Sequence, residues 1–519
     1  MPHDLLTRIR LALFLLLSFA RAASPAELVW RDNDDLAAPE PAEDREGDFL
    51  WWHDARSLSL YQAGKVLDLG AAARSIGEWT GLAGPREAAN VNALDEAPDS
   101  TWFTNRHAAH PLTAEEIARG PADGRPPSPD GPLTIVSGKG LGEVPGFIVE
   151  DEKGDRYLVK FDPVDHPELA TGAEQVSARI VHALGWNVPD YHLAVFDPAR
   201  LVIGEGARIE DEHGRKRPMV RSHVEEILAE VSRRGDGRLR ASMSRMIPGE
   251  PKGPFRFEGM RRDDANDTIP HEHRRDLRGF RIVAAWIHHT DFRPANTLDV
   301  FVVDESDPRG HGHLVHYLLD FSSTLGSADL EWKHPKLGHE YTIDPPVIVA
   351  NLVALGAWVK PWEDLEVTHP TIGYLKGEPF DPERWVTEYP NPIFDGMTAR
   401  DAFWGAKLVA SFRDEDLRAV IRSGEWSDAR VEEILFTVLR ERRERILRSY
   451  FDVERVNPVD RFRMDAAGLA FDDLAVAAGI VGRSAARYRY RLPPGEWVES
   501  AEPVVPLEGA ATGAAIELE

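Results

Sequence analysis

The stretch His289-Thr290-Asp291-Phe292-Arg293-Pro294-Ala295-Asn296, followed further on by Asp320-Phe321-Ser322, decides how this chain folds. A carboxylate in a loop can accept or orient the proton of a hydroxyl group. An asparagine amide oxygen and a second carboxylate are ligands that Mg²⁺ or Mn²⁺ accepts. We therefore expect an acid–base role for Asp291, and metal-ligand roles for Asn296 and Asp320.

Three features upstream fit the same chemistry. Lys160 lies near the end of a strand pattern at 156–161, and Glu174 lies on a helix pattern at 168–184 that could pack against this strand. The lysine could hold phosphate groups as a point charge, and the glutamate could pair with it. A glycine-rich hairpin at 137–142 precedes them, and we expect its Gly138, Gly140 and Gly142 to help bind a nucleotide. Phosphoryl transfer needs such a set, because the protein must position the transferred group and neutralise its charge.

The loop ending at Asn296 resembles the catalytic loop of protein kinases, with its His, Asp and Asn in register. Asp320-Phe321-Ser322 resembles the kinase metal-binding Asp-Phe-Gly, and Tyr157-Leu158-Val159-Lys160 resembles the strand with the kinase lysine. The resemblance covers about residues 133–450 and is nearest to atypical branches of the superfamily: HipA-like, lipid-kinase-like and secretory-pathway kinases. It implies ATP or another nucleotide as donor, with Mg²⁺ or Mn²⁺.

Several positions depart from the kinase pattern. Thr290 stands where typical kinases have an arginine that meets a phosphorylated activation loop, so we do not expect that mode of activation. Ser322 replaces the glycine after Asp-Phe, which we expect to stiffen this segment. The glycine spacing is unusual, the interval from Asn296 to Asp320 is long, and the sequence has no Ala-Pro-Glu segment. Rules for peptide substrates therefore cannot be carried over.

The patterns together predict an α+β, bilobal protein-kinase-like fold, with an antiparallel-sheet N-lobe, a mostly helical C-lobe and extensions at both ends. We expect a signal peptide at 1–22, an extension and linker at 23–130, the N-lobe at 131–250, the C-lobe at 251–455 and an appended unit at 456–519. The expected strands are 133–136, 146–150, 156–161, 191–196, 239–247, 297–303 and 314–319, and the expected helices are 168–184, 224–231, 274–289, 346–355, 402–412 and 428–450.

Composition limits the function. The formal net charge of -26 argues against nucleic acid or an anionic membrane as the main partner, although a local basic pocket could still bind a nucleotide. The chain has no cysteine, which excludes disulfides, thiolate zinc sites, iron–sulfur clusters and cysteine nucleophiles.

The first residues have the order of an export signal. Arg8 and Arg10 precede an apolar run at 11–19, and Ala20-Arg21-Ala22 supplies small residues for cleavage. The run is too short to span a membrane. We expect an exported protein, periplasmic or secreted, with no transmembrane segment in the mature chain.

Three functions stay open. The first is phosphoryl transfer to a hydroxyl acceptor, which could be a protein, a lipid or a small molecule. The second is nucleotidyl (AMP) transfer on the same fold. The third is a nucleotide-binding pseudokinase or scaffold.

Some further residues have structural interpretations. We expect His289 to pack in the core, and His311, His313 and His316 to lie in a solvated turn. We expect Trp102 to be an aromatic anchor beside Asp99.

Overall fold

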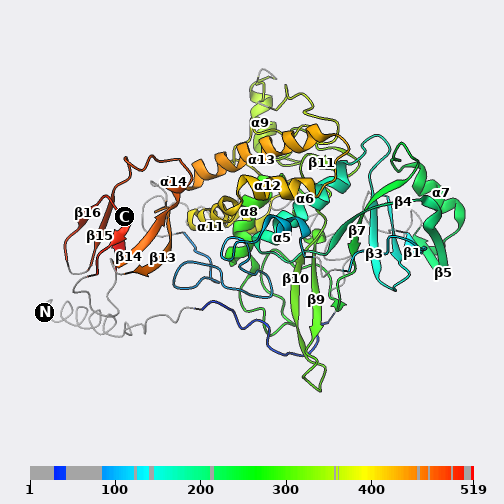
Figure 1. The fold of residues 1–519 in the computed structure, drawn as a ribbon, viewed down its shortest axis with the longest axis horizontal. Helices are drawn as coiled ribbons and strands as arrows, with labels where there is room; N and C mark the ends of the chain where they lie inside the picture. The colour runs from blue at the N-terminus through cyan, green and yellow to red at the C-terminus, as the bar shows by residue number, and fades with distance from the viewer. Residues whose placement is uncertain are drawn as a thin grey trace, which may run out of the picture.

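The computed structural model describes residues 29–42, 85–121, 125–138, 145–210, 215–355, 358–360, 362–452, 456–465, 468–492, 495–507 and 516–518. It has a mixed α/β architecture with one large, mainly antiparallel sheet and a body of helices (Figure 1). The predicted signal peptide and the glycines Gly140 and Gly142 lie outside these described residues.

The large sheet has seven strands in the order β4-β7-β3-β2-β1-β5-β6. Its strands are β1 (Leu133–Gly138), β2 (Gly146–Glu150), β3 (Arg156–Phe161), β4 (Tyr191–Phe196), β5 (Leu201–Glu210), β6 (Lys216–Pro218) and β7 (Leu239–Arg245). Neighbours are antiparallel except β1 and β5, which are parallel. Alternate side chains of these strands form one hydrophobic cluster, with α7 (Arg221–Ala229) covering part of it.

Helix α6 (Leu169–Leu184) follows β3 and is buried over most of its surface. It ends where Gly185 adopts a φ of 133°, a conformation that favours glycine. Gln175 donates to Ser242 Oγ of β7 over 3.1 Å, which fixes the helix to the sheet. The side chain of Glu174 is thereby held on a rigid element.

The helical body forms the largest hydrophobic cluster. Its helices are α8 (Arg275–Ile287), α10 (Pro392–Asp395), α11 (Ala399–Ser411), α12 (Asp414–Arg422) and α13 (Ala429–Tyr450). The Trp286 indole of α8 donates to the Leu439 carbonyl of α13 over 2.8 Å, and Arg442 donates back to the Trp286 carbonyl over 3.0 Å. These bonds hold α8, which leads into the loop at 288–296, against the longest helix.

A β-hairpin follows that loop. Strand β9 (Thr297–Val303) pairs with β10 (Gly312–Leu318) in an unbroken antiparallel register from Thr297↔Leu318 to Val303↔Gly312. The short β8 (Glu250–Pro251) lies on the other side of β9. In Figure 1 the hairpin projects below the helical body.

The segment before the large sheet packs on the helical body. Trp102, Phe103 and Ile117 are buried in the same cluster as α8 and α11, and α5 (Ala114–Arg119) contacts α12. Trp102 stacks on His316 with ring centres 3.5 Å apart, and the Arg274 guanidinium lies 4.7 Å from the Trp102 ring centre. The interpretation of Trp102 as a packed anchor therefore agrees with its contacts.

The end of the chain forms a small β-rich unit with its own hydrophobic cluster. It contains β13 (Val459–Asp465), β14 (Gly468–Asp473), α14 (Leu474–Ala477), β15 (Tyr488–Arg491), β16 (Val498–Ser500), β17 (Val504–Val505) and β18 (Glu517–Leu518). Among the residues that the structure describes, no helix combines the length and apolarity that crossing a bilayer requires.

Most predicted elements are confirmed within a few residues. The predicted helix at 402–412 begins earlier, because Thr398 caps α11 by accepting from the Asp401 amide. Strands β5 and β6 and helix α12 were not predicted. His316 was expected in a solvated turn, but it is buried under Trp102, and its Nδ1 lies 2.7 Å from Asp299.

Candidate active site

Lys160 and Glu174 form a buried ion pair. Lys160 Nζ of β3 lies 2.8 Å from Glu174 Oε1 of α6, and the two side chains are 6% and 1% exposed. Burial alone would lower the pKa of Lys160, but the carboxylates of Asp320 and Glu174 outweigh it and hold that pKa well above its usual value. Burial raises the pKa of Glu174, and the charge of Lys160 opposes this rise. The ammonium group is thus fixed in its charged form.

Asp320 is the third member of this cluster and its most exposed one. Its Oδ1 lies 2.6 Å from Lys160 Nζ, and its side chain is 33% exposed. The backbone at Asp320 has a φ of 55°, a left-handed conformation that is uncommon outside glycine and concentrates at functional sites. The Asp320 amide donates to the Tyr191 hydroxyl over 3.3 Å, and Ser322 Oγ donates to Asp320 Oδ1. These bonds hold the carboxylate beside the lysine.

The loop at 288–296 begins where His288, with a φ of 57°, ends helix α8. His289 then packs among aromatic rings: its centre lies 5.5 Å from that of Phe321 and 6.1 Å from that of Phe292. Burial lowers the pKa of His289 to about 3, so the ring is neutral. Its role as a packing residue agrees with the expectation from sequence.

Asp291 and Asn296 are joined at the end of the loop. Asn296 Nδ2 donates to Asp291 Oδ2 over 2.9 Å and to the Asp291 carbonyl over 2.7 Å. The amide oxygen is then the remaining polar atom of the Asn296 side chain. Burial raises the pKa of Asp291 to about 7, although Arg293, whose Nε lies 3.0 Å from Asp291 Oδ1, lowers it.

The β9–β10 hairpin brings the loop to Asp320. Asn296 immediately precedes β9, and Leu319 immediately follows β10. The Leu319 amide donates to the Asn296 carbonyl over 2.9 Å, which extends the ladder by one bond beyond the strands. Asn296 and Asp320 therefore lie at the same end of one hairpin, although 24 positions separate them along the chain.

This donor set fits a hard divalent cation and a nucleotide phosphate. An Asp carboxylate and an Asn amide oxygen are oxygen ligands, and such sites complete their shell with phosphate oxygens and water. The adjacent Lys160 supplies positive charge for phosphate. No cluster of three or more His, Cys, Asp or Glu side chains arranged for a metal occurs within the described ranges, so an all-protein zinc site at His311 or His313 finds no support there.

Lys333 is a residue of this region that the sequence did not reveal. Its buried Nζ donates to Thr290 Oγ1 over 2.7 Å and to the Ser323 carbonyl over 2.9 Å. Thr290 Oγ1 donates to Glu388 Oε1 over 2.6 Å. Thr290 therefore occupies the position that holds arginine in typical kinases. Its hydroxyl links Lys333 to Glu388 through two hydrogen bonds. No local motif marks Lys333, because it lies in an irregular segment far from the loop in sequence.

Of the three predicted glycines, only Gly138 is described. It ends β1 and pairs with Phe147 of β2. A Cβ atom added at Gly138 would come within 3.0 Å of Ile209, so the position also packs closely against β5. A role for this hairpin in nucleotide binding stays a prediction.

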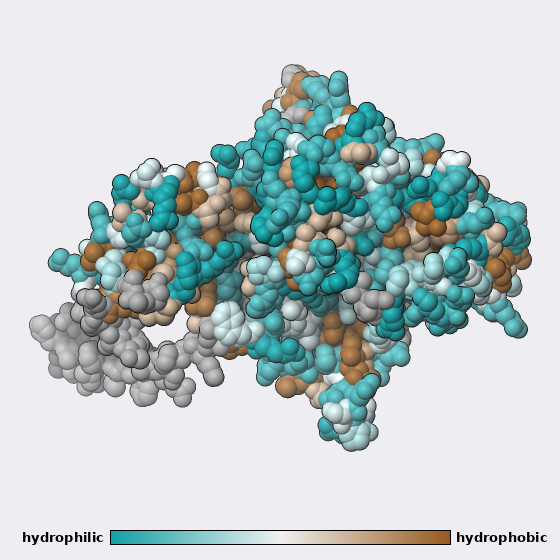
Figure 2. Space-filling model, viewed as in Figure 1, coloured by the Kyte–Doolittle hydropathy of each residue, from teal (hydrophilic) through white to brown (hydrophobic). Residues whose placement is uncertain are grey.

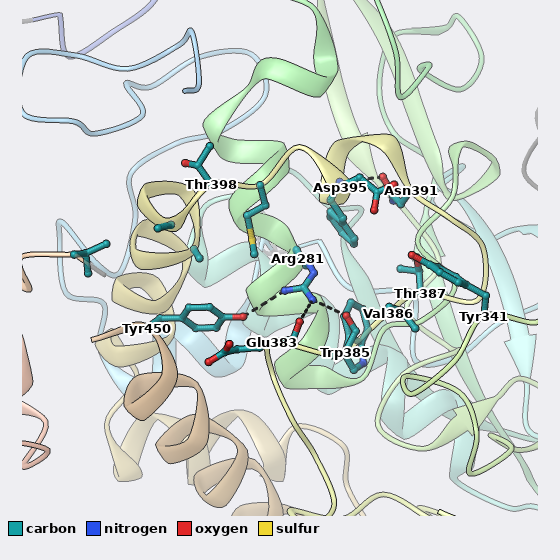
Figure 3. Close-up of a pocket in the computed structure, with 15 residues that line it drawn as sticks. Arg281, Tyr341, Glu383, Trp385, Val386, Thr387, Asn391, Asp395, Thr398 and Tyr450 are labelled. Carbon is teal, nitrogen blue, oxygen red and sulfur yellow. Dashed lines mark hydrogen bonds between the residues drawn. The ribbon is translucent and has the colours of Figure 1, made fainter. Parts of the chain in front are cut away.

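A cavity of about 430 Å³ is lined by residues of α8, α10, α11 and the segment 383–387 (Figure 3). The buried Arg281 of α8 dominates it and donates to the carbonyls of Glu383 and Trp385 and to the Tyr450 hydroxyl. Its lining includes Phe394, whose ring stacks on Phe292 with centres 5.1 Å apart. None of the predicted site residues lines this cavity, so we assign it no part in the chemistry.

No protein-family model matches the chain, and no curated protein matches its sequence. The chain is similar to solved structures of a Golgi casein kinase with Mn and ADP bound (11% identity, 62% of this chain and 74% of that one, TM-score 0.28), of a Golgi casein kinase (11%, 63% and 76%, TM-score 0.28) and of hydra Fam20 with sugar (11%, 44% and 69%, TM-score 0.24). These TM-scores lie below 0.5, so the kinase-like interpretation rests on the side chains described above.

Proposed function

We propose that this protein is an atypical, protein-kinase-like phosphotransferase with a bilobal core, which moves a phosphoryl group from a nucleotide to a hydroxyl acceptor with Mg²⁺ or Mn²⁺. The single observation that carries the proposal is the position of Lys160 between Glu174 and Asp320. A buried lysine paired to a helix glutamate and to a carboxylate beside the Asp291 loop is the arrangement that phosphoryl transfer uses to hold phosphate and metal.

Each residue has a role in this proposal. Lys160, oriented by Glu174, binds phosphate oxygens of the donor. Asn296 and Asp320 would hold the metal ion, which when bound neutralises charge on the transferred group. Asp291 accepts the acceptor's hydroxyl proton as the hydroxyl oxygen bonds to the γ-phosphorus. The bond from that phosphorus to the bridging oxygen breaks, and the nucleoside diphosphate leaves.

The pKa of Asp291 supports its role as a base. A general base works best when its pKa lies near the operating pH. A carboxyl group with a pKa of about 7 is largely ionised just above neutral pH yet holds a transferred proton well. The hydrogen bond from Asn296 orients its carboxylate.

We further propose export of the mature protein, on the strength of the sequence at 1–22. The acceptor class stays open among protein, lipid and small molecule.

The test is metal-dependent turnover of ATP by the purified protein, with product identified by mass spectrometry of any modified acceptor. We expect ADP and a phosphorylated acceptor, lost in Asp291→Ala and Lys160→Met and kept in Lys216→Met, a control at an exposed lysine. A nucleotidyl mass shift instead would establish AMP transfer. Metal-dependent stabilisation by nucleotide without turnover would establish a pseudokinase, and the absence of both would refute the proposal.

A further inference from the structure

Helix α9 (Pro345–Val353) and the residues after it form an apolar projection with no counterpart elsewhere in the described part of the chain. The most exposed members are Leu352 (69%), Val353 (80%) and Leu355 (92%). Ile348, Val349, Trp358 and Val359 are also exposed. The helix stands at the top of the molecule in Figure 1, and apolar side chains appear over it in Figure 2. Soluble surfaces rarely keep so many neighbouring large apolar side chains in water without a partner.

The base of this projection is fastened to the protein. Lys360 Nζ lies 3.1 Å from both carboxylate oxygens of Glu340, and both side chains are nearly buried. The same ammonium lies 5.4 Å from the ring centre of Trp362, which stacks on His339. At the other end, the Asp344 carboxylate caps α9 by accepting from the Val347 amide. The apolar segment therefore projects from a fixed base.

The chemistry of the segment distinguishes a bilayer from a protein groove. The sequence from 345 to 359 contains no charged residue, and no side chain of α9 for which exposure is described is buried. A helix that docks in a protein groove keeps a polar face for water, whereas a helix that is apolar nearly all round is buried in a protein core or in a membrane. Asn351 is the one polar side chain of α9, and none of the α9 side chains with described exposure lies in the core of this protein. Trp358, which is 42% exposed just beyond the helix, is of the residue type that anchors at a membrane–water interface.

Length sets the mode of contact. Nine helical residues rise about 14 Å, roughly half the hydrocarbon thickness of a bilayer. The segment can enter one leaflet and cannot cross the membrane. Since the chain carries a net charge of -26, insertion would depend on apolar contact rather than on attraction to anionic lipid.

We propose that α9, together with Leu355, Trp358 and Val359, forms a membrane-docking surface that inserts into one leaflet of a lipid bilayer. This surface is independent of phosphotransfer, and its test needs no activity.

The first experiment measures co-sedimentation with phosphatidylcholine vesicles, with and without anionic phosphatidylglycerol, at low and high salt. The wild-type protein is expected to bind both vesicles with little dependence on salt. Leu352→Glu/Val353→Glu should lower the bound fraction at least about tenfold, because charged side chains are costly in hydrocarbon. The matched control, Val220→Glu/Met246→Glu, changes two exposed apolar residues elsewhere and should bind like wild type.

The second experiment uses the lack of cysteine in the chain, which makes any introduced cysteine a unique labelling site. An environment-sensitive dye on Leu352→Cys should shift to the blue with vesicles and be quenched by lipids labelled in the acyl chain, whereas the dye on Val220→Cys should not respond. The proposal is overturned if wild type ignores both vesicles, if the glutamate variant still binds, or if the Leu352 label stays in water. It is also overturned if the glutamate variant instead abolishes self-association in lipid-free solution, since a second copy would then cover the helix.

Discussion

Lys333 Nζ lies 2.7 Å from Thr290 Oγ1, and through that hydroxyl it is joined to Glu388. In kinases whose catalytic loop carries an arginine here, a phosphorylated loop supplies the partner charge. In this protein the lysine and the glutamate belong to the folded chain itself. The loop is therefore held by contacts within the folded chain, and we predict that its geometry does not depend on a phosphorylated partner.

The charges of this pair should be visible in the pH dependence of activity. Burial raises the pKa of Asp291, Lys333 lowers it and Glu388 raises it further. We expect the rising limb of the pH–kcat profile to move to higher pH in Lys333→Met and to lower pH in Glu388→Gln. Shifts in the same direction in both variants would contradict this electrostatic account. Lys216→Met is the control and should leave the profile unchanged.

Asp291 itself should set the position of that limb. Wild type should gain activity as pH rises through about 7, because the carboxylate must be ionised to accept a proton. Asp291→Asn should lower kcat by roughly 10²- to 10⁴-fold, which is the usual contribution of a general base. Asp304→Asn, on the distant tip of the β9–β10 hairpin, should keep full activity.

The same carboxyl group should affect stability in the opposite sense. Its folded-state pKa of about 7 lies above the ordinary aspartate pKa of 3.8, so the folded state binds more protons between these values and loses stability as pH rises. Asp291→Asn should therefore melt at the same or a higher temperature than wild type at pH 8, with a smaller advantage at pH 5. A variant that melts much lower at pH 8 would show that the ionised carboxylate is a structural requirement.

The Lys160–Glu174 pair should show strong coupling in a double-mutant cycle. Lys160→Met leaves Glu174 buried without its counter-charge, and breaking a buried pair in this way costs about 3–5 kcal/mol. Lys160→Met/Glu174→Gln removes both charges and should recover much of that loss in thermal or urea unfolding. Purely additive effects would argue against a specific pair.

Metal and nucleotide should stabilise the protein together. ATP with Mn²⁺ is expected to raise the melting temperature, and EDTA should remove the effect. Asp320→Asn and Asn296→Ala should lose this response, while Asp307→Asn, in the hairpin tip, should keep it. If Asp320→Asn responds like wild type, the assignment of the metal ligands is wrong.

The structure brings Lys160, Glu174 and Asp320 together as the sequence predicted, while their roles stay predictions. The grouping of Lys160, Glu174 and Asp320 could be predicted because the first two lie on regular elements, Asp320 follows a strand closely, and their order along the chain is informative. Lys333 and Glu388 could not, since both lie in irregular segments and act through contacts distant in sequence. Strand β5 was missed because Gly204 and Gly206, a residue type depleted in strands, interrupt its apolar residues, and because its parallel pairing with β1 depends on tertiary structure. The packing around Trp102 could not be predicted either, because its partners Arg274 and His316 lie in distant parts of the sequence.

Because the register of β9 and β10 is continuous, the spacing between Asn296 and Asp320 does not depend on the length of the hairpin. Asn296 and Asp320 are spaced by the first rungs of the ladder, and the turn at 304–311 lies at its far end. Residue pairs could be added or removed opposite one another at the far end of the hairpin without altering the spacing of Asn296 and Asp320, the two predicted metal ligands. A single-residue insertion in one strand would instead turn its side chains to the opposite face. The turn is therefore a place where this protein could accept a tag, a reporter or an extra loop while its chemistry stays as it is.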